Sequence, residues 1–331
     1  MSSAPTEARR DRLALEPGRI VGDRFRVVAP IATGGMGEVA LAKHLALGIE
    51  VALKVARRRQ DVSLLRAEAL ALHRARHPGV VAFLDYGELP GASAYLAMEF
   101  VRGGNLASLL ARRGPLDPAA AVGLLRPLAE ALDHVHAVGL VHRDLKPGNV
   151  LVDPAFGVKL CDFGFARELG SAVPRGIEEG TREHMAPEQA LGGVVTSASD
   201  RWALAALALQ CVTGQRVPSA LTGASASAEP AGAGQAPVLD LGSQPLEHFF
   251  ARALARDVAQ RPRTSAELIS GLEAVLYSVR RSEGALRVGG APRSSGPLRV
   301  SSSLRAIVPP GSLAAIGAVA SSAPAELLRS A

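Results

Sequence analysis

Cysteine is scarce in this sequence, with 2 in 331 residues. Two cysteines cannot build the disulfide framework of a small secreted domain, and the first residues lack the apolar stretch of a secretory signal. We therefore expect a cytoplasmic chain that folds around a hydrophobic core. The length is typical of about two domains.

Long uninterrupted apolar runs are also missing. The most hydrophobic late stretch, residues 306–323, is broken by Pro309 and Pro310 and by several serines and glycines. A bilayer span needs about 20 consecutive apolar residues, so we expect no membrane span.

An excess of charge of one sign is confined to the end of the chain. The net charge is +6, and residues 280–331 hold seven arginines and two glutamates, so the remainder is nearly neutral. These arginines are spread singly among small residues without aromatic neighbours, which favours a disordered tail over a nucleic-acid-binding one. The 8 histidines and 2 cysteines show no zinc-ligand spacing, and we expect His134 and His136 to pack or cap.

A polar stretch at residues 140–164 carries the clearest chemical pattern. Two short β-branched runs, 150–152 and 158–161, are separated by turn residues and predict a hairpin that brings Asp162 beside Asn149. Carboxylate and amide oxygens of this kind suit Mg²⁺, which takes its other ligands from water and phosphate. Asp144 is then left to hold an attacking hydroxyl.

The motif HRDLKPGN at residues 142–149, followed by DFG at 162–164, resembles the catalytic and metal-binding loops of protein kinases. The motifs resemble those of the eukaryotic-type (Hanks-type) Ser/Thr kinases found in bacteria. The resemblance implies an α+β, two-lobed fold, with a small, mainly β N-lobe that carries one helix and a larger, mainly α C-lobe.

This resemblance sets the expected domain boundaries. Residues 1–18 are expected to form a flexible leader and residues 19–280 the kinase domain, with the N-lobe at about 19–99 and the C-lobe at about 102–280. Residues 218–245 are rich in Ala, Gly and Ser and predict a low-complexity insert. Residues 281–331 are expected to be a low-complexity basic tail.

Patterns along the chain predict the helices and strands. Helices are expected at about residues 61–76, 106–112, 118–138, 196–214, 246–256 and 264–280, and strands within 24–55, at 80–86 and at 93–99.

Several segments resemble the parts of a kinase that bind ATP. A glycine turn lets backbone N–H groups approach phosphate, and here Gly34 and Gly37 fit the family pattern while Ala32 replaces its first glycine. The backbone groups of Glu99 and Val101 would bind adenine. The expected ATP-binding residues are Ile31, Gly34, Gly35, Gly37, Val39, Ala52, Lys54, Met98, Glu99, Val101 and Leu151.

The resemblance also assigns catalytic roles. It places Lys54 on the α- and β-phosphates with Glu68 as its ion-pair partner, and Asn149 and Asp162 on Mg²⁺, with Mn²⁺ as an alternative. Asp144 would accept the proton of the substrate hydroxyl. Lys146, which is typical of Ser/Thr kinases, would lie near the γ-phosphate.

The resemblance assigns regulatory or structural roles to six further positions. Arginine beside the catalytic aspartate commonly grips a phosphorylated activation segment, so Arg143 points to regulation through Ser171 or Thr181. Glu188 is expected to pair with Arg261. Asp200 would tie its helix to the backbone of the catalytic loop, and the alternative is a simple charge at a helix N-terminus.

Three functions remain open from the sequence. The first is an autophosphorylating Ser/Thr protein kinase of bacterial signalling, with ATP and protein substrates as partners. The second is a catalytically weak pseudokinase scaffold, suggested by Ala32 and the low-complexity insert. The third is a small-molecule phosphotransferase, which the combination of Ala186-Pro187-Glu188 and Arg261 disfavours.

Overall fold

The N-terminal part of the structure is a six-stranded antiparallel sheet with one helix. The computed structural model describes residues 15–34, 37–56, 58, 60–153, 157–168, 184–218, 221 and 239–288. The strand order is β1-β2-β3-β4-β6-β5. The N-lobe elements are β1 (Ile20–Val21), β2 (Phe25–Gly34), β3 (Gly37–His44), β4 (Glu50–Val55), α1 (Asp61–Arg74), β5 (Phe83–Leu89) and β6 (Ser93–Glu99).

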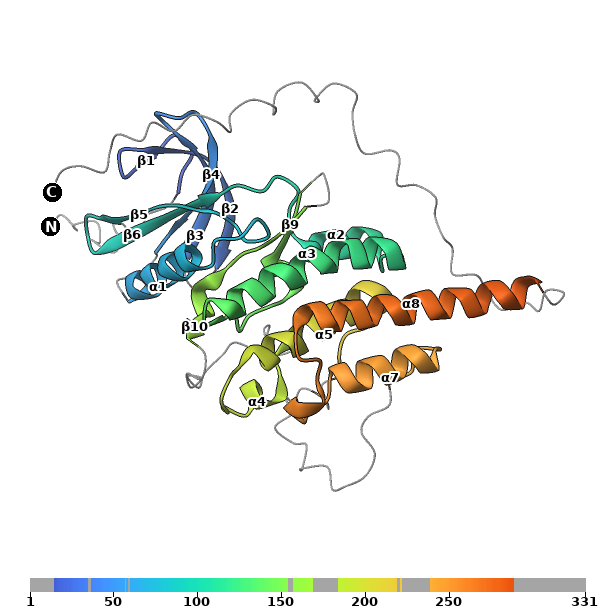
Figure 1. The fold of residues 1–331 in the computed structure, drawn as a ribbon. Helices are drawn as coiled ribbons and strands as arrows, with labels where there is room; N and C mark the ends of the chain where they lie inside the picture. Colours follow the sequence, from blue (N-terminus) through green and yellow to red (C-terminus); the bar gives the residue numbers. More distant parts are fainter. Residues whose placement is uncertain are drawn as a thin grey trace, which may run out of the picture. The chain divides into compact units, whose positions relative to one another are not determined.

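The two faces of this sheet serve different purposes because side chains alternate along each strand. Val51, Leu53 and Val55 belong to a buried cluster on one face. Ala52 and Lys54 point to the other face, where Val39 is the partner of Lys54 and Met98 is the partner of Ala52. Helix α1 packs against the sheet (Figure 1). One face is therefore a closed core, and the other presents Lys54 to α1.

The following part is mainly helical. Its elements are α2 (Leu106–Arg113), α3 (Pro118–Ala137), β7 (Leu140–Val141), η2 (Pro147–Asn149), β8 (Val150–Val152), β9 (Val158–Leu160), η3 (Phe163–Phe165), β10 (Arg167–Glu168), α4 (Pro187–Ala190), α5 (Ser197–Thr213), α7 (Gln244–Ala253), η5 (Val258–Gln260) and α8 (Ser265–Val288). The strands form two small antiparallel ladders, β8 with β9 and β7 with β10.

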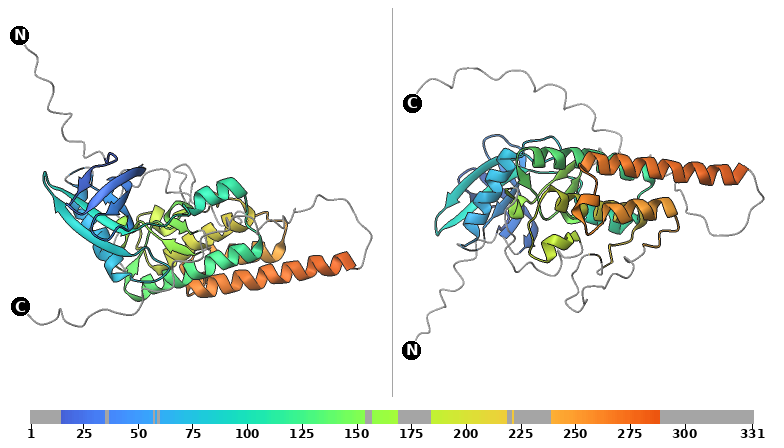
Figure 2. Two further views of the ribbon diagram at one scale, coloured as in Figure 1. Left: turned by 90° about the horizontal axis from the view of Figure 1, so that it is seen from above. Right: turned by 60° about the horizontal axis from the view of Figure 1, so that its bottom comes forward.

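Helices α3, α5 and α8 frame the C-lobe. Asp117 caps α3 by accepting from the N–H groups of Ala119 and Ala120, and Thr196 caps α5. Asp133 of α3 accepts hydrogen bonds from Ser265 N and Ala266 N, which fixes the start of α8 against α3. Figure 2 shows α8 running along α3, with α7 beside it.

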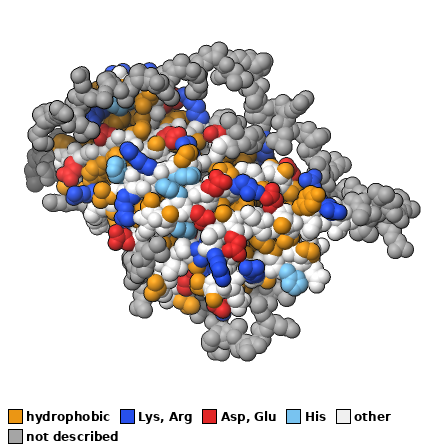
Figure 3. Space-filling model, in the orientation of Figure 1, with side chains coloured by type: hydrophobic (Ala, Val, Ile, Leu, Met, Phe, Trp, Pro, Cys, Tyr) orange, Lys and Arg blue, Asp and Glu red, His pale blue; other side chains and the backbone are white. Residues whose placement is uncertain are grey.

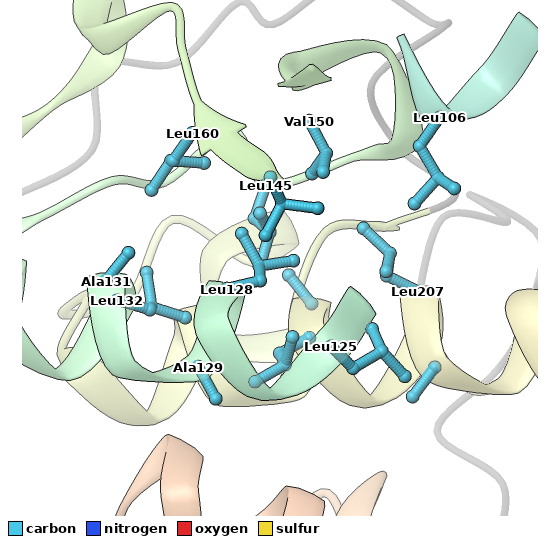
Figure 4. Close-up of a cluster of buried hydrophobic side chains, with 14 of the residues drawn as sticks. Leu106, Leu125, Leu128, Ala129, Ala131, Leu132, Leu145, Val150, Leu160 and Leu207 are labelled. Atoms are coloured by element: carbon cyan, nitrogen blue, oxygen red, sulfur yellow. The ribbon is translucent and has the colours of Figure 1, made fainter. Parts of the chain in front are cut away.

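The core of this lobe holds the catalytic loop in place. Leu128 and Leu132 of α3 are fully buried and point toward Leu145 and the β8–β9 hairpin (Figure 4). Leu145 lies between Asp144 and Lys146 in the sequence. Burying one leucine stabilises the fold by about 2 kcal/mol. The buried Leu145 side chain therefore anchors the backbone that carries Asp144 and Lys146.

The boundaries differ from those expected in three places. Leu15 is buried in the N-lobe core, although it lies within the segment expected to be a flexible leader. Leu221 and Leu239 are buried in the C-lobe core, and α7 starts at Gln244, all within the expected insert of 218–245. Helix α8 continues to Val288, past the boundary expected at residue 280. Isolated leucines in an otherwise polar or small-residue context give little periodic signal, which explains why Leu15, Leu221 and Leu239 were not expected in the core.

The surface of the described residues is mixed in charge. On the face drawn in Figure 3, basic and acidic side chains are interspersed, as the nearly neutral composition of this part predicts. None of the helices in the described ranges has the length and apolar character that crossing a membrane requires.

Candidate active site

The catalytic loop holds Asp144 in a network of short contacts. Lys146 Nζ donates to Asp144 Oδ2 at 2.8 Å, and Asn149 Nδ2 donates to the same oxygen at 2.9 Å and to the Asp144 carbonyl at 2.8 Å. Asp144 is 3% exposed. Its Oδ1 is buried and has no hydrogen-bond partner among the described residues. One carboxylate oxygen is thus fixed, while the other is left to accept a proton or a hydrogen bond from a ligand.

Lys54 and Asp162 connect the two lobes. Lys54 Nζ lies 2.7 Å from Glu68 Oε2 on α1 and 3.2 Å from Asp162 Oδ1, which follows β9. Glu68 is 1% exposed, whereas about a third of the Asp162 side chain is exposed (34%). The structure therefore brings together an amine and two carboxylates that the sequence places far apart.

Their mutual attraction sets the charge states. Burial alone would lower the pKa of Lys54, but the charges of Glu68 and Asp162 raise it above its ordinary value. Burial alone would raise the pKa of Asp162, but Lys54 holds it below the usual range. A cationic Lys54 and an anionic Asp162 are the states that triphosphate and metal binding need.

Two residues of the site adopt a left-handed backbone conformation that side chains rarely take. Arg143 has φ 71° and Asp162 has φ 63°. Such positions cost about 1–3 kcal/mol each and persist where the surroundings hold them. Gln189 Nε2 donates to the Arg143 carbonyl at 2.8 Å, and Asp200 Oδ1 accepts from Arg143 N at 2.8 Å. The strain at Arg143 is therefore balanced by two hydrogen bonds.

Asp200, in the first turn of α5, holds the backbone of the catalytic loop. Its Oδ2 accepts from His142 N at 2.8 Å and lies 2.8 Å from His136 Nε2. Burial alone would raise the pKa of Asp200, but the contact with His136 keeps it lowered. Asp200 thus contacts the backbone of the catalytic loop, as the resemblance implies. A side chain that only placed charge at the N-terminus of a helix would not make these contacts.

A second ion pair, between the buried Arg261 and the partly buried Glu188, lies outside the catalytic loop. Arg261 Nη1 and Nη2 each donate to one oxygen of Glu188 at 2.8 Å, and Ser199 Oγ donates to Glu188 Oε1 at 2.7 Å. Burial alone would raise the pKa of Glu188, but the hydrogen bonds from Arg261 and Ser199 lower it. This bidentate pair fixes the start of α4 to the turn before α8.

The donor set fits a divalent cation with hard oxygen ligands. Asn149 donates from its amide nitrogen to Asp144, so its amide oxygen is the atom that would bind a cation. Asp162 uses Oδ1 for Lys54 and carries a second oxygen on a partly exposed side chain. One amide oxygen and one carboxylate match the few protein ligands that Mg²⁺ takes beside water and phosphate.

Three of the residues expected to contact ATP lie on the same face of the sheet as Lys54. Val39, Ala52, Lys54 and Met98 share one face of the sheet through the β3–β4 and β4–β6 registers. Gly37 has φ 147°, and a Cβ there would collide with the Val55 carbonyl, so only glycine suits this turn.

The other expected ATP contacts lie in β2, at the end of β6 and in β8. Ile31 falls at an irregularity of β2, and Ala32 pairs with Val39. Glu99 ends β6, Val101 follows it, and Leu151 lies in β8. Gly34 is the last residue of β2, whereas Gly35, Ser171 and Thr181 lie outside the described residues.

Cys161, which directly precedes Asp162, is partly buried. Burial raises the pKa of its thiol, and the neighbouring carboxylates raise it further. The thiol is therefore protonated near neutral pH, consistent with a packing residue.

Three supporting residues were not singled out as partners from the sequence. His136 contacts Asp200, Gln189 contacts Arg143, and Ser199 contacts Glu188. Each is a common residue type on a helix, and the sequence around it holds no signal that separates it from a surface residue.

With this geometry in view, the comparison with known families is decisive. Residues 25–270 match the family described as protein kinase domain. The chain belongs to the protein kinase family. The two-lobed fold predicted from the motifs is confirmed by this match. Members of the family use ATP and a divalent metal.

Individual relatives are bacterial Ser/Thr kinases. Serine/threonine-protein kinase PknA of Mycobacterium tuberculosis is 40% identical over 210 residues, which is 60% of this chain and 49% of PknA. Serine/threonine-protein kinase pkn2 of Myxococcus xanthus is 36% identical over 285 residues, 78% of this chain and 33% of the relative. PrkC of Bacillus subtilis is 34% identical over 208 residues, 61% of this chain and 32% of the relative. The chain therefore spans about half or less of the length of these relatives.

Proposed function

We propose that this chain is a Ser/Thr protein kinase, which transfers the γ-phosphoryl group of ATP to serine and threonine hydroxyls of proteins. The observation that carries the proposal is the convergence of Lys54, Glu68 and Asp162, with contacts of 2.7 and 3.2 Å. Beside them lies a catalytic loop in which Asp144 Oδ1 has no hydrogen-bond partner among the described residues. The names of the relatives, all Ser/Thr kinases, support the same acceptor class.

Each side chain has a proposed role. Lys54, held by Glu68, binds the α- and β-phosphates, and Lys146 lies beside the position of the γ-phosphate. Asp144 orients the acceptor hydroxyl through Oδ1 and accepts its proton as the phosphoryl group arrives. Asn149 and Asp162 hold the divalent cation, which neutralises phosphate charge when bound. We propose Mg²⁺ as that cation, with Mn²⁺ as a substitute.

The remaining expectations extend the proposal. We place the catalytic domain at about residues 19–280, and we keep Ile31, Gly34, Gly35, Gly37, Val39, Ala52, Met98, Glu99, Val101 and Leu151 as its ATP contacts. Both cysteines are free thiols, which supports a cytoplasmic location.

Regulation through the activation segment is a separate proposal. Burial lowers the pKa of Arg143, and the positive charge of Arg167 lowers it further, so two cations lie close together there. A phosphate on Ser171 or Thr181 would relieve this repulsion. Mass spectrometry after incubation with ATP tests it, because a fully active chain without phosphate at either position contradicts the proposal.

The proposed function is tested by the identity of the phosphorylated product. The purified chain is incubated with Mg²⁺ and ATP labelled on the γ-phosphate, with a generic protein substrate in one reaction and an aminoglycoside in another. A Lys54→Met preparation, purified in the same way, controls for contaminating kinases. We expect label on serine and threonine of the protein, absent with Lys54→Met.

The other two functions give different products. Label found in the aminoglycoside alone identifies a small-molecule phosphotransferase. ATP binding without transfer to either acceptor identifies a pseudokinase scaffold. Either result contradicts the proposal.

A further inference from the structure

Lys159, in the middle of β9, makes contacts that the proposed chemistry does not use. Its neighbours in the strand, Val158 and Leu160, are buried in the hydrophobic core. Because side chains alternate along a strand, Lys159 points to the opposite side. It is paired with Leu151 of β8, one of the expected ATP contacts. Paired residues of antiparallel strands share a face, so Lys159 lies on the same face of the hairpin as Leu151.

The ammonium group of Lys159 joins two segments of the N-lobe. Lys159 Nζ donates to the Pro78 carbonyl at 3.0 Å and lies 2.9 Å from Glu99 Oε2. The same Glu99 oxygen accepts a hydrogen bond from Ala82 N at 3.1 Å. The lysine side chain is 22% exposed and the glutamate side chain 33%, so both are partly shielded from water. The ion pair therefore ties β9 to the end of β6 and to the loop between α1 and β5.

Backbone hydrogen bonds reinforce the same arrangement. Leu160 N donates to the Gly79 carbonyl at 2.8 Å, and Val81 N donates to the Leu160 carbonyl at 3.0 Å, so the loop before β5 runs along β9. At the end of this loop, Glu99 N donates to the Ala82 carbonyl at 2.9 Å. Glu99 is therefore held both at its N–H group and at its side chain, which restricts the position of its own carbonyl.

Adenine and guanine present opposite groups to a backbone carbonyl. Adenine carries an amino group, which donates, where guanine carries a carbonyl oxygen, which accepts. A carbonyl that is held in place bonds the amino group of adenine and faces the oxygen of guanine with no proton between them, which disfavours guanine. A carbonyl that can turn away avoids this contact. The preference for adenine therefore depends on how firmly Glu99 is held.

We propose that Lys159 is a positioning residue for adenine. Through its ion pair with Glu99 it fixes the backbone carbonyl that would bind the amino group of adenine, and in this way it sets the preference of the site for ATP over GTP. The lysine acts through Glu99 and needs no contact of its own with the nucleotide. The proposal rests on the proposed kinase function, because it concerns the nucleotide that binds at the same site.

Nucleotide binding by the full chain tests the proposal. The Kd values for ATP and GTP are measured in the presence of Mg²⁺ by isothermal titration calorimetry, for the wild-type chain and for Lys159→Met. We expect the wild type to prefer ATP by about tenfold or more. In Lys159→Met the ratio of the two Kd values should fall about threefold to fivefold, as for the loss of a partly exposed ion pair, mainly because ATP binds more weakly. Lys159→Arg keeps the cation and should restore most of the preference.

Two further variants make the test specific. Glu99→Gln removes the other partner of the ion pair and should also lower the ratio. Adding Lys159→Met to it should have little further effect, because both residues act through one contact. Arg126→Met is the control, since it removes the cation of an ion pair with Glu273 of α8, whose side chains are about half exposed, and it should leave the ratio unchanged. Circular dichroism and thermal unfolding establish that all variants fold alike.

The outcomes separate this inference from the proposed function. A lower ratio in Lys159→Met that Lys159→Arg restores supports the inference, and in that case a complete lack of phosphoryl transfer counts against the kinase function alone. An unchanged ratio overturns the inference even if the wild type phosphorylates proteins. Equal weakening of ATP and GTP binding also overturns it, because that is the effect of a lysine that only stabilises the fold. So does a wild-type chain that binds GTP as tightly as ATP.

Discussion

Lys54 Nζ lies 2.7 Å from Glu68 Oε2, with 10% of the lysine side chain and 2% of the glutamate side chain exposed. The pair places the positive end of Lys54 within 3.2 Å of Asp162 on the opposite lobe. Because the pair is buried, each partner depends on the other for its charge.

Glu68→Gln tests this dependence. Without Glu68, Lys54 loses the contact that positions it toward the phosphates. We expect kcat/KM for phosphoryl transfer to fall roughly a hundredfold, which corresponds to about 3 kcal/mol of transition-state stabilisation. Arg24→Ala removes an ion pair of similar length, 2.9 Å, whose arginine is 60% exposed, and it should change kcat/KM less than about twofold. Equal effects of the two variants would rule out a special role for Glu68.

Metal dependence of nucleotide binding tests the role of Asp162. We expect ATP to bind the wild-type chain more tightly with Mg²⁺ than with EDTA, by isothermal titration calorimetry. In Asp162→Asn this advantage should disappear, because the neutral amide no longer attracts the cation. Asp257→Asn is the control, since Asp257 caps η5 at an exposed position and asparagine caps equally well. A full Mg²⁺ advantage in Asp162→Asn would show that another residue holds the metal.

The contribution of the Glu188–Arg261 pair to the free energy of unfolding should depend on pH. The pKa of Glu188 is lowered in the folded state, so its stabilising effect is present above the ordinary glutamate pKa of about 4.3 and is lost as the pH falls further. We expect Glu188→Gln to lower the free energy of unfolding by about 3 kcal/mol at pH 7, and by progressively less below about pH 4.3.

Denaturant unfolding across this pH range measures the effect. Glu273→Gln serves as the control, because its ion pair with Arg126 is about half exposed and should contribute less than about 1 kcal/mol. A deficit in Glu188→Gln that stays constant with pH would contradict the lowered pKa.

The core beneath the catalytic loop should be sensitive to cavities. Leu128 is 0% exposed and packs toward Leu145 (Figure 4), so Leu128→Ala should cost about 2–5 kcal/mol. Leu191→Ala, at a side chain that is 77% exposed, should change stability by less than about 0.5 kcal/mol. Trp202, the one tryptophan of the sequence and fully buried, supplies a fluorescence signal for unfolding. Similar losses for the two leucines would mean that the packing shown in Figure 4 is wrong.

The sequence predicts the fold well where a motif or a strong periodicity is present. The strand at residues 93–99 and the helix at 118–138 agree with β6 and α3 to within one residue, because β-branched or apolar spacing continues to their ends. The strand expected at 80–86 instead runs from Phe83 to Leu89. Val80 is buried and pairs with Leu160 of β9. The first residues of the predicted strand are therefore apolar because they contact the other lobe.

The site itself could be predicted only in part. The family motifs name Lys54 and Asp162, but their contact joins residues 108 positions apart, and no local pattern encodes a distance across two lobes.

The kinetics of Asp144→Asn test the central claim most directly, since Asp144 is the one group assigned to the proton of the acceptor hydroxyl. Its amide replacement keeps the shape of the side chain and the contact with Asn149 while removing the basic oxygen. The measurement is kcat for phosphoryl transfer to a serine peptide, together with the Kd for ATP. The account predicts that kcat falls about 10²–10⁴-fold while the Kd changes by less than about twofold. A variant that retains the wild-type kcat would contradict it.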